Sequence, residues 1–338
     1  MTALADPPMR AAPPVAAPAF LDIQGLTVEH PLRGGRKVHA VTDLDLRLAK
    51  GETLGLVGES GCGKSSAARA ILQLPRPTRG RVILDGQDLT ALSGGALRRA
   101  RRRFQMIFQD PIASLNPRRT VAEIVAAPLE IAGEGDARAR RETVEEMLEL
   151  VGLDPRHAME RRPHEFSGGQ CQRISIARAL ALRPELLICD EPVSALDVSI
   201  QAQILNLLAD LKARFGLTMV FISHDLAVVK NVSDRVAVMH LGRLCEEAGA
   251  EALYRDPAHP YTRVLLSAAP RPDPHARPQP LPMQEGDPPS PIDPPSGCRF
   301  RTRCPQAQAL CAQVSPPVAA RAPGHALACH FPPEGGGP

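Results

Sequence analysis

A glycine-rich loop between an apolar strand and a helix restricts the fold of this chain more than any other feature of its sequence. Residues 53–65 read TLGLVGESGCGKS, which matches the strand, loop and helix start of a phosphate-binding P-loop. Glycines allow the backbone to curl so that several N–H groups and the helix N-terminus face an anion. Only five of the 40 basic residues are lysines, so the lysine at this position is unusually informative.

The residues of this loop have separate roles in the predicted site. Lys64 is expected to reach the β- and γ-phosphates of ATP or GTP, and the Ser65 hydroxyl to coordinate Mg²⁺. The alternative, a glycine-rich turn that only caps a helix, is disfavoured by the strand–loop–helix context. The expected phosphate-binding residues are Gly58, Glu59, Ser60, Gly61, Cys62, Gly63, Lys64, Ser65 and Ser66.

An acidic motif supplies the second half of the predicted site. LLICDE, residues 186–191, reads as a buried strand that ends in two acids. Asp190 is expected to hold Mg²⁺ through water, and Glu191 to orient or deprotonate the attacking water. The alternative is an ordinary buried strand that ends at the surface, and the P-loop already found makes it the weaker interpretation.

The hydrophobic pattern predicts an α/β fold. Residues 20–89 are strand-like, with one helix at about 64–74, and residues 92–165 are mostly helical. After residue 167, helices and strands alternate, which favours a parallel sheet flanked by helices with a helical insertion between its halves.

The stretch HEFSGGQCQR, residues 164–173, indicates the class of P-loop protein. Ser167 reads as a helix N-cap, and the glycines after it permit close approach of the backbone to an anion. This stretch resembles the LSGGQ signature of the ABC ATPases, with Phe166 in place of leucine. The resemblance implies an ABC ATPase core with an antiparallel β subdomain and a helical subdomain at about 92–180. It also implies that Ser167, Gly168, Gly169 and Gln170 cover ATP held by a second ATPase subunit, identical or different.

Three further motifs resemble that family in its order along the chain. Gln109 in FQDP resembles the Q-loop glutamine, which senses the γ-phosphate, takes part in the Mg²⁺ site and contacts the membrane partner. Asp197 in SALD resembles the D-loop acid that crosses the dimer interface. His224 in FISHD resembles the switch histidine that contacts the γ-phosphate. The resemblance therefore implies Glu191, His224 and Gln109 as the catalytic residues.

The adenine site departs from the family pattern. The family stacks adenine on an aromatic residue shortly before the strand that leads to the P-loop, but residues 28–41 contain no Phe, Tyr or Trp. His30, Arg36 and His39 remain as alternatives for stacking. The expectation of ATP over GTP rests on the resemblance.

The strongest resemblance is to ATP-binding subunits of oligopeptide, dipeptide and nickel importers, and in particular to their "F" subunit. It covers residues 20–330 and rests on FQDPIASLNPRRT, CDEPVSALDVSIQAQILNLL and DPAHPYTRVLLSAAP. It implies a peripheral subunit at the cytoplasmic face of the inner membrane that powers peptide import. The implied partners are two membrane permeases, one of which docks beside residues 109–120, a second ATPase and an extracytoplasmic solute-binding protein. Nickel, glutathione or another solute remains an alternative cargo.

Composition suggests the division of the chain. Residues 1–19 are rich in Pro and Ala and are expected to form a disordered tail rather than a signal peptide. Residues 20–255 are expected to form the ATPase domain, and 256–338 a C-terminal extension. Within that extension, 11 of the 26 residues at 270–295 are proline, which predicts a linker or strap. No stretch has the roughly 18 apolar residues that a membrane helix needs.

Four cysteines at 298–329 form a cluster in the sequence. Because a cytosolic location keeps thiols reduced, disulfides are the weakest explanation of Cys298, Cys304, Cys311 and Cys329. Their spacing lacks the CxxC pairs usual in zinc ribbons. Four thiolates suit a [4Fe-4S] cluster, and members of the resembling subfamily carry one. A Zn²⁺ site and unmetallated thiols remain the alternatives.

Two other classes of ABC ATPase compete with a transporter subunit. DNA-repair ATPases separate their nucleotide motifs by hundreds of coiled-coil residues, and translation-factor ATPases carry two cassettes in one chain. The basic run at 98–104 reads as a solvated helical face, because no aromatic residues are interleaved with it to stack on bases. We therefore expect no nucleic acid partner.

Overall fold

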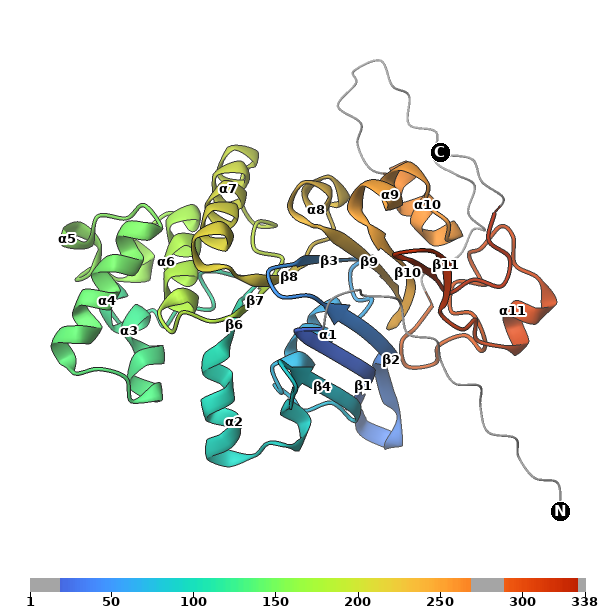
Figure 1. Cartoon of the computed structure of the whole chain (residues 1–338), viewed down its shortest axis with the longest axis horizontal. Coiled ribbons are helices and arrows are strands. Elements are labelled where there is room, and N and C mark those ends of the chain that lie inside the picture. The colour runs from blue at the N-terminus through green and yellow to red at the C-terminus, as the bar shows by residue number, and fades with distance from the viewer. Residues whose placement is uncertain (1–18, 269–288, 334–338) are drawn as a thin grey trace.

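The computed structural model describes residues 19–268 and 289–333, and in this part of the chain the strands form two sheets (Figure 1). The smaller sheet is antiparallel and has the order β2-β1-β4-β5. Its strands are β1 (Leu21–Pro31), β2 (Lys37–Leu48), β4 (Arg79–Leu84) and β5 (Gln87–Asp88). This sheet is the expected antiparallel β subdomain.

The larger sheet has eight strands in the order β11-β12-β10-β9-β3-β8-β7-β6. Neighbouring strands from β9 to β6 are parallel, and those from β9 to β11 are antiparallel. Its strands are β3 (Thr53–Val57), β6 (Phe104–Ile107), β7 (Leu186–Asp190), β8 (Thr218–Ile222), β9 (Arg235–His240), β10 (Arg243–Gly249), β11 (Ala319–Ala322) and β12 (His325–Leu327). The predicted parallel sheet is confirmed.

Each central strand of the larger sheet buries side chains on both faces. In β7, Leu187 and Cys189 pack into one hydrophobic cluster, while Leu186 and Ile188 pack into the other. This alternation follows from the two-residue period of a strand, and the covered faces explain why the strand sequences are continuously apolar. The sheet therefore places the loops at its strand ends on a rigid base.

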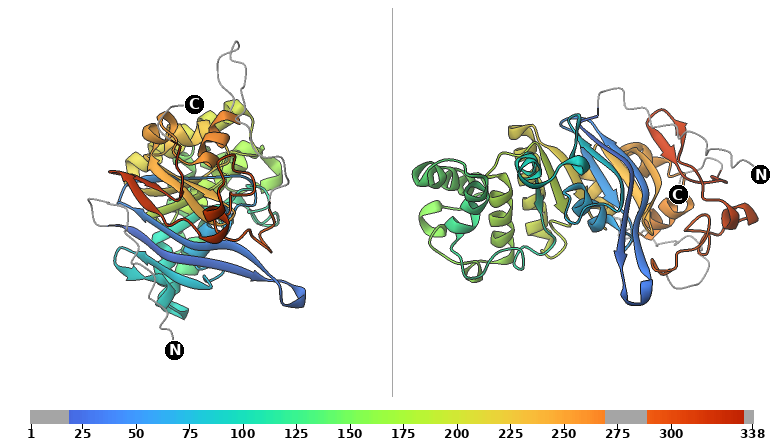
Figure 2. Two further views of the ribbon diagram at one scale, coloured as in Figure 1. Left: turned by 90° about the vertical axis from the view of Figure 1, so that its right-hand side faces the viewer. Right: turned by 90° about the horizontal axis from the view of Figure 1, so that it is seen from below.

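Helices cover both faces of this sheet, and further helices lie beyond one of its ends. Figure 1 shows α7 to α10 above the larger sheet, and α1 with the smaller sheet below it. Helices α3 to α6 form a lobe at one end of the molecule (Figure 2). The helices are α1 (Lys64–Ile71), α2 (Gly94–Ala100), α3 (Val121–Ala132), α4 (Ala137–Leu150), α5 (Pro155–Ala158), α6 (Gly168–Leu180), α7 (Val198–Phe215), α8 (Leu226–Val232), α9 (Ala250–Arg255), α10 (Pro260–Ala268) and α11 (Ala309–Gln313).

One strand lies where the sequence suggested mainly helix. β6 has only four residues, too few for its pattern to be distinguished from a helical segment, and it forms by parallel pairing with β7. Within the described residues, no helix is both long and apolar enough to span a bilayer.

The C-terminal region, residues 289–333, continues the larger sheet at the end opposite the helical lobe (Figure 2). β12 pairs with β10, and the Glu246 carboxylate in β10 accepts hydrogen bonds from the backbone N–H groups of Ala258 and His259 and contacts His325. The expected tail at 1–19 and the linker at 270–295 lie mostly outside the described residues.

Candidate functional site

The loop at 58–65 is shaped by contacts that only glycine permits. Gly58 follows β3 directly, and a Cβ placed there would lie 2.1 Å from the Met239 carbonyl oxygen. A Cβ at Gly63 would lie 2.0 Å from the carbonyl oxygen of Ala40, and its φ of +106° also favours glycine. Ser60 and Gly61 are exposed at the tip of the loop. The loop therefore packs closely on its neighbours while its tip faces solvent.

Lys64 and Ser65 take positions that fit their predicted roles. Lys64 is only 4% exposed, and its Nζ donates to the carbonyl oxygens of Gly58 at 2.8 Å and Glu59 at 3.0 Å. Its ammonium group thus lies inside the curve of the loop. Cys62 is buried beneath the loop, and Ser66 continues into α1.

The two acids at the end of β7 lie beside this loop. The Ser65 hydroxyl donates to Asp190 Oδ1 at 2.8 Å, so two expected Mg²⁺ ligands are in direct contact. Burial raises the pKa of Asp190, and the hydrogen bond from Ser65 opposes that rise. A divalent cation at this position would favour the ionised carboxylate.

Glu191 brings together the three predicted catalytic side chains. Gln109 Nε2 donates to Glu191 Oε2 at 2.9 Å, and His224 Nδ1 lies 3.4 Å from the same oxygen. Glu191 has a φ of +47°, a strained value for a residue with a side chain, and such strain is often found where a side chain must be aimed precisely. Gln109 contacts Glu191 in this structure, and its expected part in the Mg²⁺ site stays a prediction.

The predicted signature residues lie away from the P-loop. Ser167 caps α6, with its hydroxyl accepting from the Gln170 N–H at 3.3 Å, and Asp197 caps α7 by accepting from the Ile200 N–H at 3.0 Å. A Cβ at Gly169 would approach Ile200 to 2.7 Å, so the two helix starts are packed together. Figure 1 shows α6 with the helical lobe and α1 under the centre of the larger sheet. The signature residues and the P-loop of one chain therefore do not share a site.

The four C-terminal cysteines do not form a closed metal site. Cys298 and Cys311 are joined by a backbone hydrogen bond of 2.8 Å, and burial raises the pKa of Cys329 to about 11, with a further contribution from Cys298, Cys304 and Cys311. Within residues 19–268 and 289–333, no three His, Cys, Asp or Glu side chains are grouped closely enough to hold a metal ion. The arrangement of the described side chains therefore does not support the expectation of a formed site.

Sequence reasoning missed two residues that contact the P-loop from the C-terminal part of the chain. The Tyr261 hydroxyl accepts a hydrogen bond from the Glu59 N–H at 2.9 Å, and Arg303 forms an ion pair with the Glu59 carboxylate. The signal that could have indicated such a contact is Glu59 itself, because an acid in an anion-binding loop needs a compensating cation.

Comparison with known families divides the chain into two matched regions. The model described as "ABC transporter" matches residues 41–194. The model described as "Oligopeptide/dipeptide transporter, C-terminal region" matches residues 245–311.

Two relatives are similar to this chain over nearly its full length. The oligopeptide transport ATP-binding protein OppF of Salmonella typhimurium is 52% identical over 320 residues, covering 92% of this chain and 95% of that protein. The oligopeptide transport ATP-binding protein AppF of Bacillus subtilis is 50% identical over 321 residues, covering 92% and 97%.

Solved structures of similar fold match part of the chain. A dimeric ATP-binding cassette in a post-hydrolysis state with ADP and Pi is 31% identical, with a TM-score of 0.62, and the match covers 68% of this chain and 98% of the cassette. A Clostridium perfringens component of an ABC transporter complex is 25% identical, with a TM-score of 0.61, and the match covers 70% and 90%.

Proposed function

This chain belongs to the ATP-binding subunits of ABC transporters, and from that membership we propose that it hydrolyses ATP to drive peptide import across the cytoplasmic membrane. The observation that carries the proposal is the union, in one chain, of an ABC transporter region and an oligopeptide/dipeptide transporter C-terminal region. Both relatives described above are oligopeptide transport ATP-binding proteins. Nickel, glutathione or another small solute is the alternative cargo, since the ATPase does not contact what is transported.

We assign the residues of the site to separate tasks. Lys64, the loop N–H groups and the N-terminus of α1 bind the phosphates, with Ser65 and Asp190 as the residues that would hold Mg²⁺. The fit is supported by the direct Ser65–Asp190 contact and by the buried lysine. Magnesium, when bound, supplies neutralisation of charge that develops on the phosphates. In this assignment, ATP binds at the edge of the larger sheet where β7 ends and Glu191 follows.

Glu191 is placed to orient or deprotonate the attacking water. Its contacts with Gln109 and His224 hold the carboxylate in one orientation. In the nucleotide-bound state, Gln109 and His224 are expected to exchange these contacts for the Mg²⁺ site and the γ-phosphate. That exchange is how the presence of ATP would be transmitted to the rest of the subunit.

A second ATPase subunit, identical or different, is proposed to complete the site. The separation of Ser167, Gly168, Gly169 and Gln170 from the P-loop supports this proposal, because each chain offers one half of two nucleotide sites. Asp197 is proposed to cross the interface. ATP would favour the closed pair because the closed state alone completes its contacts.

Permease subunits are proposed to dock beside the Q-loop. Phe108 is 38% exposed and Ile112 is 58% exposed, and such apolar side chains are suited to a partner surface. A cavity of about 190 Å³ is lined by Phe108 together with Leu72, Leu74 and Pro128 among others. We propose two permeases and an extracytoplasmic binding protein in the assembly, with this chain peripheral at the cytoplasmic face of the inner membrane and without a nucleic acid partner.

The division of the chain and a metal at the C-terminal cysteines remain separate proposals. We propose an ATPase domain at 20–255 and an extension at 256–338, and the matches at 41–194 and 245–311 support the order of these two parts but not the boundary between them. A [4Fe-4S] cluster, or Zn²⁺ in its place, is supported only by the four-thiol donor set at Cys298, Cys304, Cys311 and Cys329. Iron, sulfide and zinc analysis of anaerobically purified protein, with Cys329→Ser against Cys171→Ala, tests it. Metal-free wild-type protein would end this proposal.

The function is tested with Glu191→Gln in the assembled transporter. The glutamine keeps the size of the side chain but cannot take a proton, so ATP turnover should fall by at least about 100-fold while ATP-dependent pairing of the subunits persists. Peptide uptake by cells that carry the variant should stop. Wild-type turnover in this variant would refute the role of Glu191. Unchanged peptide uptake on deletion of the gene, together with loss of nickel or glutathione uptake, would transfer the function to the alternative cargo.

A further inference from the structure

The C-terminal region makes direct contact with the P-loop of its own chain. Arg303 Nη1 donates to Glu59 Oε2 at 2.7 Å, and Nη2 donates to Oε1 at 2.8 Å. The two terminal nitrogens of the guanidinium therefore bind the two carboxylate oxygens. The Arg303 side chain is only 8% exposed, and that of Glu59 is 32% exposed. A two-point contact of this kind, partly removed from water, is stronger and more directional than a surface ion pair.

Further contacts hold the same part of the loop from behind. The Tyr261 hydroxyl accepts from the Glu59 N–H, and the Tyr261 ring packs on His240, with 4.5 Å between ring centroids, and on Phe300, with 5.2 Å. The N–H of Gly242 donates to the Cys62 carbonyl oxygen at 2.7 Å. The loop is therefore supported by α10 and by the turn between β9 and β10.

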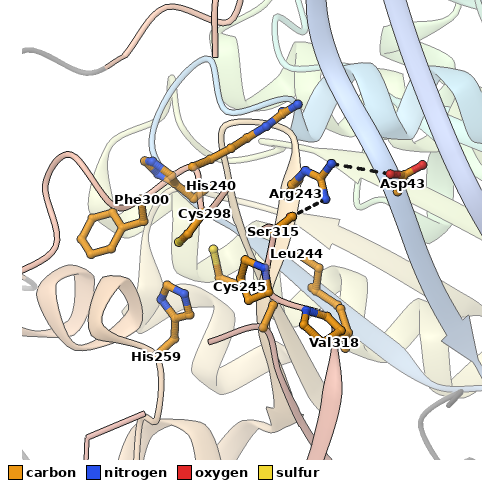
Figure 3. A pocket seen from close by; sticks show the side chains of 14 residues that line it. Asp43, His240, Arg243, Leu244, Cys245, His259, Cys298, Phe300, Ser315 and Val318 are labelled. Carbon is orange, nitrogen blue, oxygen red and sulfur yellow. Dashed lines mark hydrogen bonds and ion pairs between the residues drawn. The ribbon is translucent and has the colours of Figure 1, made fainter. Parts of the chain in front are cut away.

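The C-terminal region also holds that turn. Arg299 donates to the carbonyl oxygen of Leu241 and, at 2.8 Å, to the Thr42 hydroxyl. Figure 3 shows His240 and Phe300 beside Cys298 and Cys245 around a small cavity of about 50 Å³. Residues 298–303 thus reach the loop both directly, through Glu59, and through the turn on which it rests.

The charge of Glu59 gives the contact a consequence for nucleotide binding. A carboxylate in the second position of a loop that must accept several negative charges would repel the phosphates. The hydrogen bonds from Arg303 lower the pKa of Glu59, so the acid remains ionised and its charge is balanced by the guanidinium. With the Glu59–Arg303 pair intact, the electrostatic potential in the loop is set mainly by Lys64 and the backbone N–H groups.

We propose that Arg303 is a positioning residue of the ATP site, which neutralises Glu59 and fixes the P-loop, so that the C-terminal region contributes to nucleotide binding by its own chain. The proposal rests on the nucleotide site assigned above. It adds a function for residues that neither matched region nor motif assigns to ATP.

Single substitutions on the two sides of the pair separate a charge effect from loss of structure. Arg303→Met leaves the Glu59 charge unbalanced, so the dissociation constant for Mg·ATP should rise by about tenfold. This increase in the dissociation constant should be smaller at high salt, because salt screens the repulsion. Glu59→Gln removes the repelling charge and leaves Arg303 positive, so ATP should bind more tightly than in wild type. A purely structural pair predicts weaker binding for both variants, and that result would overturn the proposal.

The double variant and a matched control complete the experiment. Glu59→Gln with Arg303→Met should return the dissociation constant to within about threefold of wild type, because neither charge remains. Arg301→Met is the control, since Arg301 lies in the same segment but donates to Ser296. Binding is measured by calorimetry on the full chain, with kcat and KM of the assembled transporter measured in parallel. Tenfold higher KM with unchanged kcat is expected for Arg303→Met.

The pH dependence gives an independent readout. The groups that face Glu59 are Arg303, His240, Lys64 and Tyr261, and burial lowers the pKa of His240 to about 4, so His240 is neutral above about pH 5. Arg303→Met removes the main cause that lowers the pKa of Glu59, so on acidification Glu59 should become protonated in this variant before it does in wild type. The ratio of Arg303→Met to wild-type dissociation constants should therefore fall as the pH is lowered from 7 toward 5, and the double variant should show a flat ratio. Equal binding by wild type and Arg303→Met at every pH would refute this inference alone. Absence of ATP binding by wild type would refute the nucleotide site itself.

Discussion

Individual glycines set the shape of the nucleotide loop. Gly58 and Gly63 have positive φ values and are closely approached by the backbone of β9 and β2, whereas Gly61 has a positive φ but open space around it. A side chain at Gly58 or Gly63 would clash with neighbouring backbone as well as strain the φ angle, whereas a side chain at Gly61 would only strain the φ angle. Replacement by alanine should therefore have a graded effect along the loop.

Gly63→Ala is expected to destabilise the fold by about 2–4 kcal/mol, because a Cβ would collide with the Ala40 carbonyl in addition to the cost of positive φ. Gly61→Ala carries only the conformational cost of about 1–2 kcal/mol. Urea unfolding of both variants measures the difference. Equal losses would show that the Ala40 contact does not restrain the loop.

At the scale of elements, two helices begin with the same kind of cap, but only one of the two caps is also proposed to contact a nucleotide. α3 and α6 both begin with a capping box, formed by Thr120 with Glu123 and by Ser167 with Gln170. The physical role of the two caps is the same, since each satisfies N–H groups at a helix start. Only the cap of α6 is also proposed to face a nucleotide held by a second subunit.

Thr120→Ala and Ser167→Ala should each cost about 1 kcal/mol of stability through the lost cap. Ser167→Ala should in addition lower the ATPase activity of the ATPase subunits assayed without the permeases, while Thr120→Ala should leave that activity near the wild-type level. Thermal unfolding and ATPase assays on the two variants test this pair. A similar loss of activity in both would mean that the cap of α6 acts only through stability.

Buried histidines link the C-terminal region to the ATPase core at the scale of the whole molecule. His240 and His259 lie near Phe300, and burial lowers the pKa of each to about 4. The unfolded chain binds protons near pH 6.5 and the folded chain does not, so stability is full above pH 6.5 and falls as the pH drops toward about 4. Glu59 and Arg303 face the first ring, and Glu246 faces the second.

His240→Phe should reduce the loss of unfolding free energy between pH 7 and pH 4.5 by at most about 3 kcal/mol, because an apolar ring has no proton to gain. Free energies of unfolding in urea at the two pH values provide the measurement. The exposed residue His164, changed to Gln, is the control and should keep the wild-type slope. An unchanged slope in His240→Phe would show that His240 does not contribute.

The sequence predicted the elements with strong local patterns and missed those that depend on distant pairing. The P-loop and the strand of Asp190 follow from composition and order, because each motif contains its own turn chemistry or apolar run. β6 has four residues and needs β7 to be recognised as a strand. The contact between Arg303 and Glu59 joins positions 244 residues apart, and no periodicity can report such a distance.

The placement of β12 beside β10 has a consequence for self-association. Both outer strands of the larger sheet, β6 and β11, have only four residues, so little unpaired backbone is offered to another chain. A chain shortened before β12 would end its sheet at the seven-residue strand β10 instead. That longer edge is a template for pairing between molecules, and the C-terminal region thus acts as a cover that discourages aggregation of the ATPase core.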